Sequence, residues 1–213
     1  MPNTPISARR SLLLRSLGLV AATAAPAWIT PALAQGTRLT PTPSQTEGPF
    51  YPVALPADTD FDLLKNGAAS YTQGQAAWVV GTLTDTRGVP VGGAVVEIWQ
   101  CDHEGRYHHP GDGNRADPSF QGFGRVTVGK DGAYRFRTMR PARYSGRTPH
   151  IHVKVKLDGQ ELLTTQFYVE GDPGNRRDGL WRRLGEAAQA ALTKPYVQTA
   201  DGLRAAYPLV VQA

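Results

Sequence analysis

The sequence predicts a mainly β protein, an antiparallel β-sandwich with an extended N-terminal arm and one C-terminal helix. Three observations predict this fold class. From Ala76 onward, short apolar runs are separated by turn dipeptides. About seven such runs follow one another at the spacing typical of sandwiches. Near the C-terminus the apolar residues change from the period of a strand to the period of a helix.

The first 34 residues are typical of an export signal. They contain the paired Arg9 and Arg10, a modest apolar stretch, and a small-residue A-L-A sequence that ends at Ala34. Paired arginines favour the twin-arginine route, which carries folded proteins; a Sec-type signal is the alternative. Two prolines interrupt the apolar stretch, so we expect no stable membrane insertion. We expect an exported, periplasmic protein whose mature chain begins at Gln35.

Residues 35–75 are rich in Pro, Thr and Gly and show little periodicity, which predicts an extended arm. Residues 76–213 form the predicted sandwich domain. Its strands are expected in the runs 76–85, 94–102, 124–139 and 150–170. Asp-Gly pairs at 131–132 and 158–159 are typical of tight hairpin turns, so the strands around each pair are expected to associate antiparallel.

After these strands, apolar residues recur at helical spacing from Leu180 to Leu192. Asp178 is positioned to cap the start of this helix and Pro195 to end it. A final apolar strand closes the chain. The stretch GTLTDTRGVPVGGAVVEIW, followed by DGAYRF, resembles transthyretin-like sandwiches, which often serve as structural modules.

Charge and cysteine content exclude several classes of function. The chain has a formal net charge of +5, and three of its arginines belong to the predicted signal, which leaves +2 for the mature part. No basic run combines with aromatic residues there, so we expect no nucleic-acid partner. Cys101 is the single cysteine, which excludes an internal disulfide and cysteine-based metal clusters.

The segment RTPHIHVKVKL places His150 and His152 one residue apart in a predicted strand. Side chains at i and i+2 point to the same face, so both imidazoles can reach one metal ion; the alternative is a pair of histidines on a solvated face. Tyr107 and Tyr144 lie in loops nearby in the sequence, and loop-capping roles are their alternative. Phenolate and imidazole donors together favour Fe(III) over zinc.

Four ordered motifs, TPSQTEGPFYP, GRY, ARY…GRTPHIH and TTQFYVEGDPGN, cover most of residues 40–180. In this order they resemble the intradiol ring-cleavage dioxygenases. The resemblance implies a mononuclear non-haem Fe(III) cofactor. Its ligands would be Tyr107, Tyr144, His150 and His152.

The same resemblance implies an activity in aromatic catabolism. A catechol-type small aromatic diol would react with O2 to give a cis,cis-muconate-type diacid. Tyr144 would be the ligand that leaves when the substrate arrives. Arg147 would stabilise charge on the substrate ring, and Gln166 would be a polar residue of the pocket, although a surface ion pair and a strand-edge amide are their respective alternatives.

Only Ser145 and Gly146 separate Tyr144 from Arg147, where the family usually carries a longer insertion, so we expect a more open pocket. The sequence shows no long helical N-terminal region of the kind some members use to dimerise. A homo-oligomer would therefore use the sandwich or the arm.

Two other functions remain open at this point. One is a non-catalytic transthyretin-like module that binds a carbohydrate or peptide. The other is a zinc hydrolase that uses the histidine pair, although the sequence offers no evident acidic third ligand. We expect His103, His108 and His109 to be exposed loop residues, with His108 or His109 at the pocket mouth, and Tyr51 either reaches the site or packs beside it.

Overall fold

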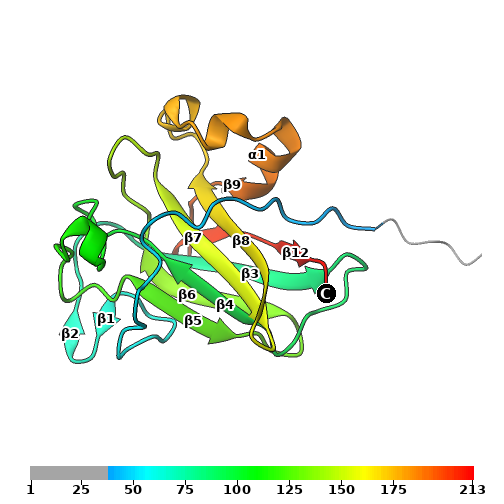
Figure 1. Ribbon diagram of the computed structural model, residues 1–213, viewed down its shortest axis with the longest axis horizontal. Helices are drawn as coiled ribbons and strands as arrows, with labels where there is room; N and C mark the ends of the chain where they lie inside the picture. The colour runs from blue at the N-terminus through cyan, green and yellow to red at the C-terminus, as the bar shows by residue number, and fades with distance from the viewer. Residues whose placement is uncertain (1–37) are drawn as a thin grey trace, which may run out of the picture. The chain divides into compact units, whose positions relative to one another are not determined.

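The computed structural model describes residues 38–213, which lie within one compact unit, Gly36–Ala213. The predicted export signal, residues 1–34, lies outside the described residues. Two five-stranded sheets pack against each other (Figure 1). The first sheet contains β10 (Val197–Thr199), β11 (Gly202–Ala206), β3 (Ala76–Asp85), β12 (Leu209–Val211) and β6 (Ala133–Met139). The second contains β5 (Phe123–Thr127), β4 (Val95–Trp99), β7 (His150–Leu157), β8 (Gln160–Val169) and β9 (Thr193–Lys194).

The predicted mainly β sandwich is confirmed, with one difference in strand direction. The central pairs β3–β6, β4–β5, β4–β7 and β7–β8 are antiparallel. The short C-terminal strands β11 and β12 instead pair parallel to β3, and β9 pairs parallel to β8. These short strands extend the two sheets, and Ala205, Leu209 and Val211 from β11 and β12 add side chains to the core.

The alternation of side chains along β7 places the two histidines on the outer face of the second sheet. Ile151, Val153 and Val155 are fully buried in the core between the sheets. Because side chains alternate along a strand, His150 and His152 point to the opposite, outer face. They are nevertheless only 1% exposed, so something else must cover that face.

The cover is the predicted arm. Residues 38–61 contain no helix or strand, and the blue segment crosses β8 and β7 in Figure 1. The backbone N–H of Gln45 donates to the carbonyl of Thr164 (2.8 Å), and the hydroxyl of Thr165 donates to the carbonyl of Pro43 (2.7 Å). The arm also holds a small hairpin of β1 (Lys65–Asn66) and β2 (Ala69–Ser70), and its boundary at residue 75 stays a prediction.

One hairpin prediction is confirmed and the other is wrong. Around Asp158 and Gly159, which have φ of +50° and +80°, β7 and β8 pair antiparallel as expected. The strands around Asp131-Gly132 do not pair with each other, because β5 pairs with β4 in the second sheet and β6 with β3 in the first. The turn reverses the chain locally, but it does not determine which strand becomes the neighbour.

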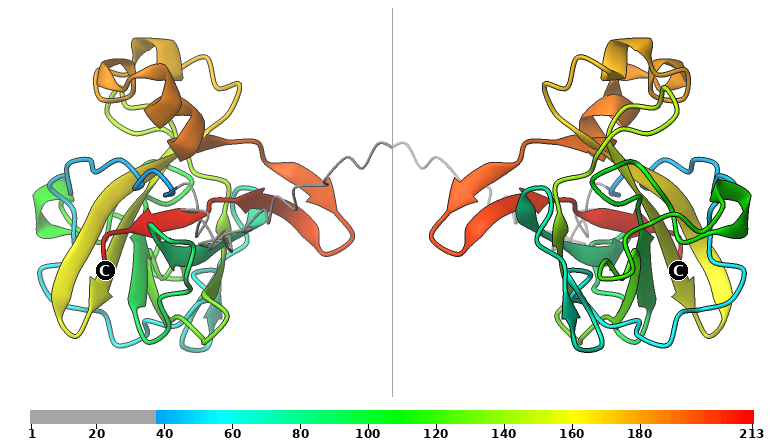
Figure 2. Two further views of the ribbon diagram at one scale, coloured as in Figure 1. Left: turned by 90° about the vertical axis from the view of Figure 1, so that its right-hand side faces the viewer. Right: turned by 90° about the vertical axis from the view of Figure 1, so that its left-hand side faces the viewer.

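The predicted helix from Leu180 to Leu192 is shorter than expected. Only α1 (Glu186–Leu192) is α-helical, preceded by the 3-10 turns η2 (Asn175–Arg177) and η3 (Trp181–Arg183). Gly185 is extended, with ψ of 161°, and breaks the helix. Figure 2 shows this helical region at one end of the sheets. None of the helices in residues 38–213 has the length and apolar character that a membrane span requires.

Candidate metal centre

The two histidines lie side by side on the outer face of β7. In the register of the second sheet, His152 lies between Trp99 on β4 and Gln166 on β8, and His150 is opposite Tyr168. The Trp99 indole stacks on the His152 ring, with centroids 4.9 Å apart and planes 10° apart. The Nε2 atoms of the two histidines are 3.2 Å apart.

Both imidazoles are held in the neutral form. Burial, reinforced by the charge of Arg147, lowers the pKa of His150 to about 4. Burial, together with the neighbouring His150, also lowers the pKa of His152 well below its usual value. Nδ1 of His150 lies 2.6 Å from the carbonyl oxygen of Thr148, so it must carry the proton that it donates there. The lone pair of His150 is therefore on Nε2, the atom that faces His152, as a metal ligand requires.

Tyr107 comes from the loop between β4 and β5. Its backbone N–H donates to a carboxylate oxygen of Asp112 (2.8 Å), which fixes the residue in the loop. Its side chain is 3% exposed, and its hydroxyl has no hydrogen-bond partner. Burial, together with the nearby Cys101 and Tyr144, raises the pKa of Tyr107 well above 10. A buried phenol oxygen without a partner is costly, and a cation beside it would remove that cost.

Tyr144 comes from a different loop, between β6 and β7. Ser145 and Gly146 have φ of +41° and +77°, the pattern of a tight two-residue turn, and Tyr144 and Arg147 bridge across it. The backbone N–H of Arg147 donates to the carbonyl of Tyr144 (2.7 Å). The short connection noted in the sequence thus holds these two side chains next to each other.

Gly105 brings the two tyrosine loops into contact. It has φ of +76°, and a Cβ at this position would lie 2.5 Å from the carbonyl oxygen of Arg143 and 3.3 Å from Cβ of Tyr144. Only glycine allows both this backbone conformation and this close approach. The spacing of Tyr107 and Tyr144 therefore depends on the absence of a side chain at residue 105.

Gly105→Ala is expected to lower the free energy of unfolding by about 3 kcal/mol, because it adds an overpacking clash to the cost of a strained φ. Gly93→Ala is the matched control. Gly93 has a similar φ of +84°, but no atom lies within 4 Å of the point that a Cβ would occupy there. Gly93→Ala should lower the free energy of unfolding, measured by urea denaturation, by only about 1 kcal/mol. Equal losses for the two variants would show that the contact between the loops is unimportant.

The four predicted ligands form one cluster of rings. The centroid distances are 4.8 Å for His150–His152, 5.1 Å for Tyr107–Tyr144, 5.6 Å for Tyr144–His150 and 6.2 Å for Tyr107–His152. Within residues 38–213 no group of three His, Cys, Asp or Glu side chains could hold a metal. The phenols of Tyr107 and Tyr144 lie beside the histidine pair, and a donor set of imidazoles and phenolates is of the kind that suits Fe(III).

Arg147 and Gln166 meet beside this cluster. Arg147 donates from Nε to Asp178 (2.7 Å) and from Nη2 to Oε1 of Gln166 (2.8 Å). Burial raises the pKa of Asp178, but hydrogen bonds from Arg147 and from the amides of Trp181 and Thr148 outweigh it and hold that pKa below its usual value. The guanidinium is therefore fixed by a buried carboxylate.

The sequence predicted Asp178 as a helix cap but did not indicate that it would hold Arg147. Its other oxygen accepts hydrogen bonds from the amides of Leu180 and Trp181 (2.9 Å each), so it caps η3 and not the α-helix. Tyr168, which also donates to Gln166 (3.0 Å), went unnoticed in the sequence as well. The sequence could not have pointed to Tyr168, because the register shifts between Val155 and Lys156; an unshifted two-residue hairpin would place Phe167 opposite His150.

The arm closes the cluster from outside. A Cβ on Gly48 would lie 3.0 Å from Cε1 of His152, so the backbone there packs on the imidazole edge. Phe50 stacks on Tyr107 (4.6 Å) and meets Tyr144 edge-on (5.7 Å). Glu47 forms an ion pair with Lys154, two residues beyond His152 on the same face of β7. The arm is thus part of the site.

Tyr51 packs behind the cluster rather than reaching into it. Its ring meets Trp99 edge-on at 5.0 Å, and its hydroxyl donates to Glu97 (2.9 Å). The three other histidines lie in the β4–β5 loop. His103 and His108 are exposed as expected, and the half-buried His109 meets Phe50 at 5.5 Å, at the edge of the cluster.

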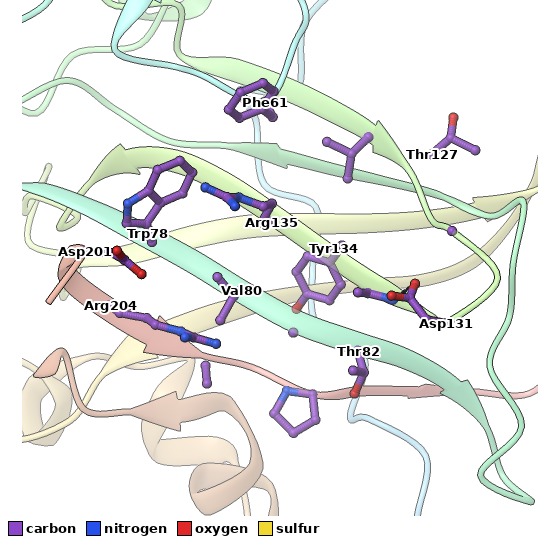
Figure 3. Close-up of a pocket in the computed structure, with 16 residues that line it drawn as sticks. Phe61, Trp78, Val80, Thr82, Thr127, Asp131, Tyr134, Arg135, Asp201 and Arg204 are labelled. Carbon is purple, nitrogen blue, oxygen red and sulfur yellow. Dashed lines mark hydrogen bonds between the residues drawn. The ribbon is translucent and has the colours of Figure 1, made fainter. Parts of the chain in front are cut away.

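A cavity of about 1280 Å³ lies elsewhere, on the outer face of the first sheet (Figure 3). Its walls include Phe61, Trp78, Arg135 and Arg204, and none of the predicted site residues. The guanidinium of Arg135 lies 4.0 Å from the ring centroid of Trp78, so this face of the indole is already covered.

The chain is similar in sequence to curated dioxygenases and in fold to a solved dioxygenase structure. A hydroxyquinol 1,2-dioxygenase from Corynebacterium glutamicum is 37% identical over 49% of this chain, and a catechol 1,2-dioxygenase from Acinetobacter lwoffii is 33% identical over 77% of it. The chain spans 40% and 57% of the lengths of these two relatives. The dioxygenase domain of a dioxygenase and carbohydrate-binding fusion protein from Streptomyces sp. SirexAA-E matches with a TM-score of 0.65 at 30% identity, over 82% of this chain and 99% of that one.

A family model described as Dioxygenase matches residues 46–210. This range includes the arm segment at Gly48 and Phe50, both tyrosine loops and the β7–β8 hairpin, so the match covers every part of the ring cluster. The chain therefore belongs to the intradiol ring-cleavage dioxygenase family.

Proposed function

We propose that this protein is an Fe(III)-dependent intradiol dioxygenase of aromatic catabolism. It inserts both atoms of O2 between the hydroxylated carbons of a catechol-type substrate and gives a cis,cis-muconate-type diacid. One observation carries the proposal: two neutral imidazoles and two phenols form a single buried cluster, in which the hydroxyl of Tyr107 has no partner.

Tyr107, Tyr144, His150 and His152 are the residues that would hold the metal. Bound Fe(III) supplies an electron-accepting centre that makes the aromatic diol reactive toward O2. The two tyrosines, as phenolates, offset two of its three charges, which reduces the cost of keeping the ion in a buried site. The neutral histidines add nitrogen donors without adding charge.

Tyr144 is suited to be the ligand that gives way to the substrate. It is half-buried on a two-residue turn, whereas Tyr107 is fully buried under Phe50. Its phenolate oxygen would then be free to accept one of the two hydroxyl protons of the diol. Arg147, held by Asp178 and Gln166, stabilises the negative charge that the deprotonated ring develops.

Reconstitution with iron tests this function. The purified protein should take up one Fe(III) per chain, show a visible phenolate-to-iron absorption band, and consume catechol and O2 in equal amounts. With ¹⁸O₂, both labelled atoms should appear in the diacid. A folded protein that binds no iron and consumes no O2 with any catechol would refute the proposal.

Neither alternative has an observation in its favour. A zinc hydrolase would want a third His, Cys, Asp or Glu ligand, and none lies beside the histidine pair in residues 38–213. A carbohydrate-binding module would use an open aromatic face, but Arg135 covers one face of Trp78 in the cavity on the first sheet.

We also propose that the enzyme acts outside the cytoplasm. The support is the sequence of residues 1–34, with its paired arginines and its A-L-A ending. Mass spectrometry of the protein from its native cells should find a mature N-terminus at Gln35 in the periplasmic or extracellular fraction. An intact N-terminus in the cytoplasmic fraction would contradict export.

A further inference from the structure

The side-chain amide of Gln166 is held at both ends. Gln166 is fully buried, and its Nε2 donates to the carbonyl of Thr46 in the arm (2.9 Å). Its Oε1 accepts from Nη2 of Arg147 (2.8 Å) and from the hydroxyl of Tyr168 (3.0 Å). The two ends of an amide are similar in shape but opposite in polarity, so these partners determine which end faces Arg147. With them in place, the oxygen faces the guanidinium.

The hydroxyl of Tyr168 has one proton and two amide neighbours. Its oxygen lies 2.6 Å from Oε1 of Gln45 in the arm and 3.0 Å from Oε1 of Gln166. A hydroxyl that donated to Gln45 would turn its lone pairs toward Gln166 and repel that oxygen. Donation to Gln166 satisfies all three groups when the Gln45 amide is turned so that its nitrogen donates to the hydroxyl.

Arg147 depends on the Gln166 amide for one of two anchors. Asp178 accepts from Nε of Arg147, and Gln166 accepts from Nη2. Two anchors on different nitrogens fix the plane of a guanidinium, whereas a single anchor leaves it free to swing. The Arg147 side chain is 20% exposed, so packing alone does not hold it. A turned Gln166 amide would present N–H groups to the guanidinium and remove the second anchor.

We infer that Tyr168 is a positioning residue of the reaction. Its hydroxyl fixes the orientation of the Gln166 amide, and through that amide it holds the Arg147 guanidinium in place for the charge that develops on the substrate ring. This inference rests on the proposed dioxygenase function. Since Gln45 and Thr46 belong to the arm, the same contacts link the docking of the arm to the position of Arg147.

Tyr168→Phe removes the hydroxyl and keeps the ring. In the iron-loaded protein it should lower kcat for catechol about tenfold, the effect of one lost hydrogen bond, and leave KM within about twofold. Iron content and the visible band should stay unchanged, because Tyr168 is not a proposed ligand. Oxygen uptake, iron analysis and the spectrum measure these effects. An unchanged kcat would overturn the inference, and so would loss of the iron.

Tyr207→Phe is the matched control. Tyr207 is also buried, and its hydroxyl donates to the backbone carbonyl of Tyr168 (2.7 Å) rather than to the Gln166 amide. Its loss should leave kcat within about twofold of wild type. An equal fall of kcat in the two variants would reflect disturbed packing around Tyr168 and would overturn the inference.

The effects of Tyr168→Phe and Arg147→Gln should not add. If the hydroxyl acts through the guanidinium, Tyr168→Phe in an Arg147→Gln background should change kcat by less than about twofold. A further fall of about tenfold in that background would mean that the hydroxyl acts independently of Arg147, contrary to the inference.

A measurement without turnover separates this inference from the proposed function. If the iron-loaded wild type consumes no O2, the dioxygenase proposal fails. The Nε–H signal of Arg147 in ¹H–¹⁵N spectra of the full chain, identified by its loss in Arg147→Gln, still reports how firmly the guanidinium is held. Its exchange with solvent should be roughly tenfold faster in Tyr168→Phe and unchanged in Tyr207→Phe. Equal exchange in Tyr168→Phe and wild type would refute the positioning role.

Discussion

Replacing Tyr107 by phenylalanine is expected to remove the visible absorption band and most of the bound iron, and to lower kcat/KM at least a thousandfold. The hydroxyl of Tyr107 is buried and has no partner within the protein, so the metal is its only proposed use. The ring itself, stacked on Phe50, should remain in place. Iron analysis, the visible spectrum and oxygen uptake measure the three effects.

Tyr134→Phe is the control for this experiment. Tyr134 is also a buried tyrosine, but it lies on β6 in the first sheet, and its hydroxyl donates to the carbonyl of Tyr207. Removing the Tyr134 hydroxyl should lower the free energy of unfolding by about 1 kcal/mol and leave the visible band and the iron content unchanged. A coloured, iron-replete Tyr107→Phe protein would remove Tyr107 from the metal site.

Arg147→Gln is expected to lower kcat about a hundredfold while iron content and colour stay unchanged. Arg147 is not a proposed ligand, and its charge should matter only when negative charge develops on the substrate ring; losing one such donor typically costs this much. Stopped-flow or steady-state oxygen uptake measures kcat, and the visible band shows that the metal remains.

Arg143→Gln is the matched control on the same loop. Arg143 forms an ion pair with Asp172 (2.6 Å), but its side chain is 48% exposed, so its contribution is expected to be small. Its kcat should stay within about twofold of wild type. If Arg147→Gln retained full kcat, the charge-stabilising role would be wrong.

The parts of the site that follow from strand periodicity were predictable. The alternation in β7 correctly placed His150 and His152 on one face, because that relation depends only on two neighbouring residues of one strand. The β7–β8 hairpin was predictable for a similar reason, since Asp158-Gly159 specifies the turn, but the register shift between Val155 and Lys156, which sets the partners of the histidines, was not.

The parts that depend on distant partners were not predictable. Asp131-Gly132 specified a turn but not that β5 and β6 would separate into different sheets. The stacking of Trp99 on His152 and the contact of Asp178 with Arg147 depend on neighbours on other strands and loops. Gly185 could have shortened the predicted helix, because glycine weakens a helix interior.

The arm has a consequence for how the protein folds. Three hydrogen bonds that attach residues 43–46 to β8 join positions 120 to 123 residues apart in the chain. Contacts of such long range form slowly, after local hairpins such as β7–β8. The chain must therefore be synthesised through β8 before residues 43–46 can dock on that strand, so the arm covers the histidines only after most of the sandwich has been made.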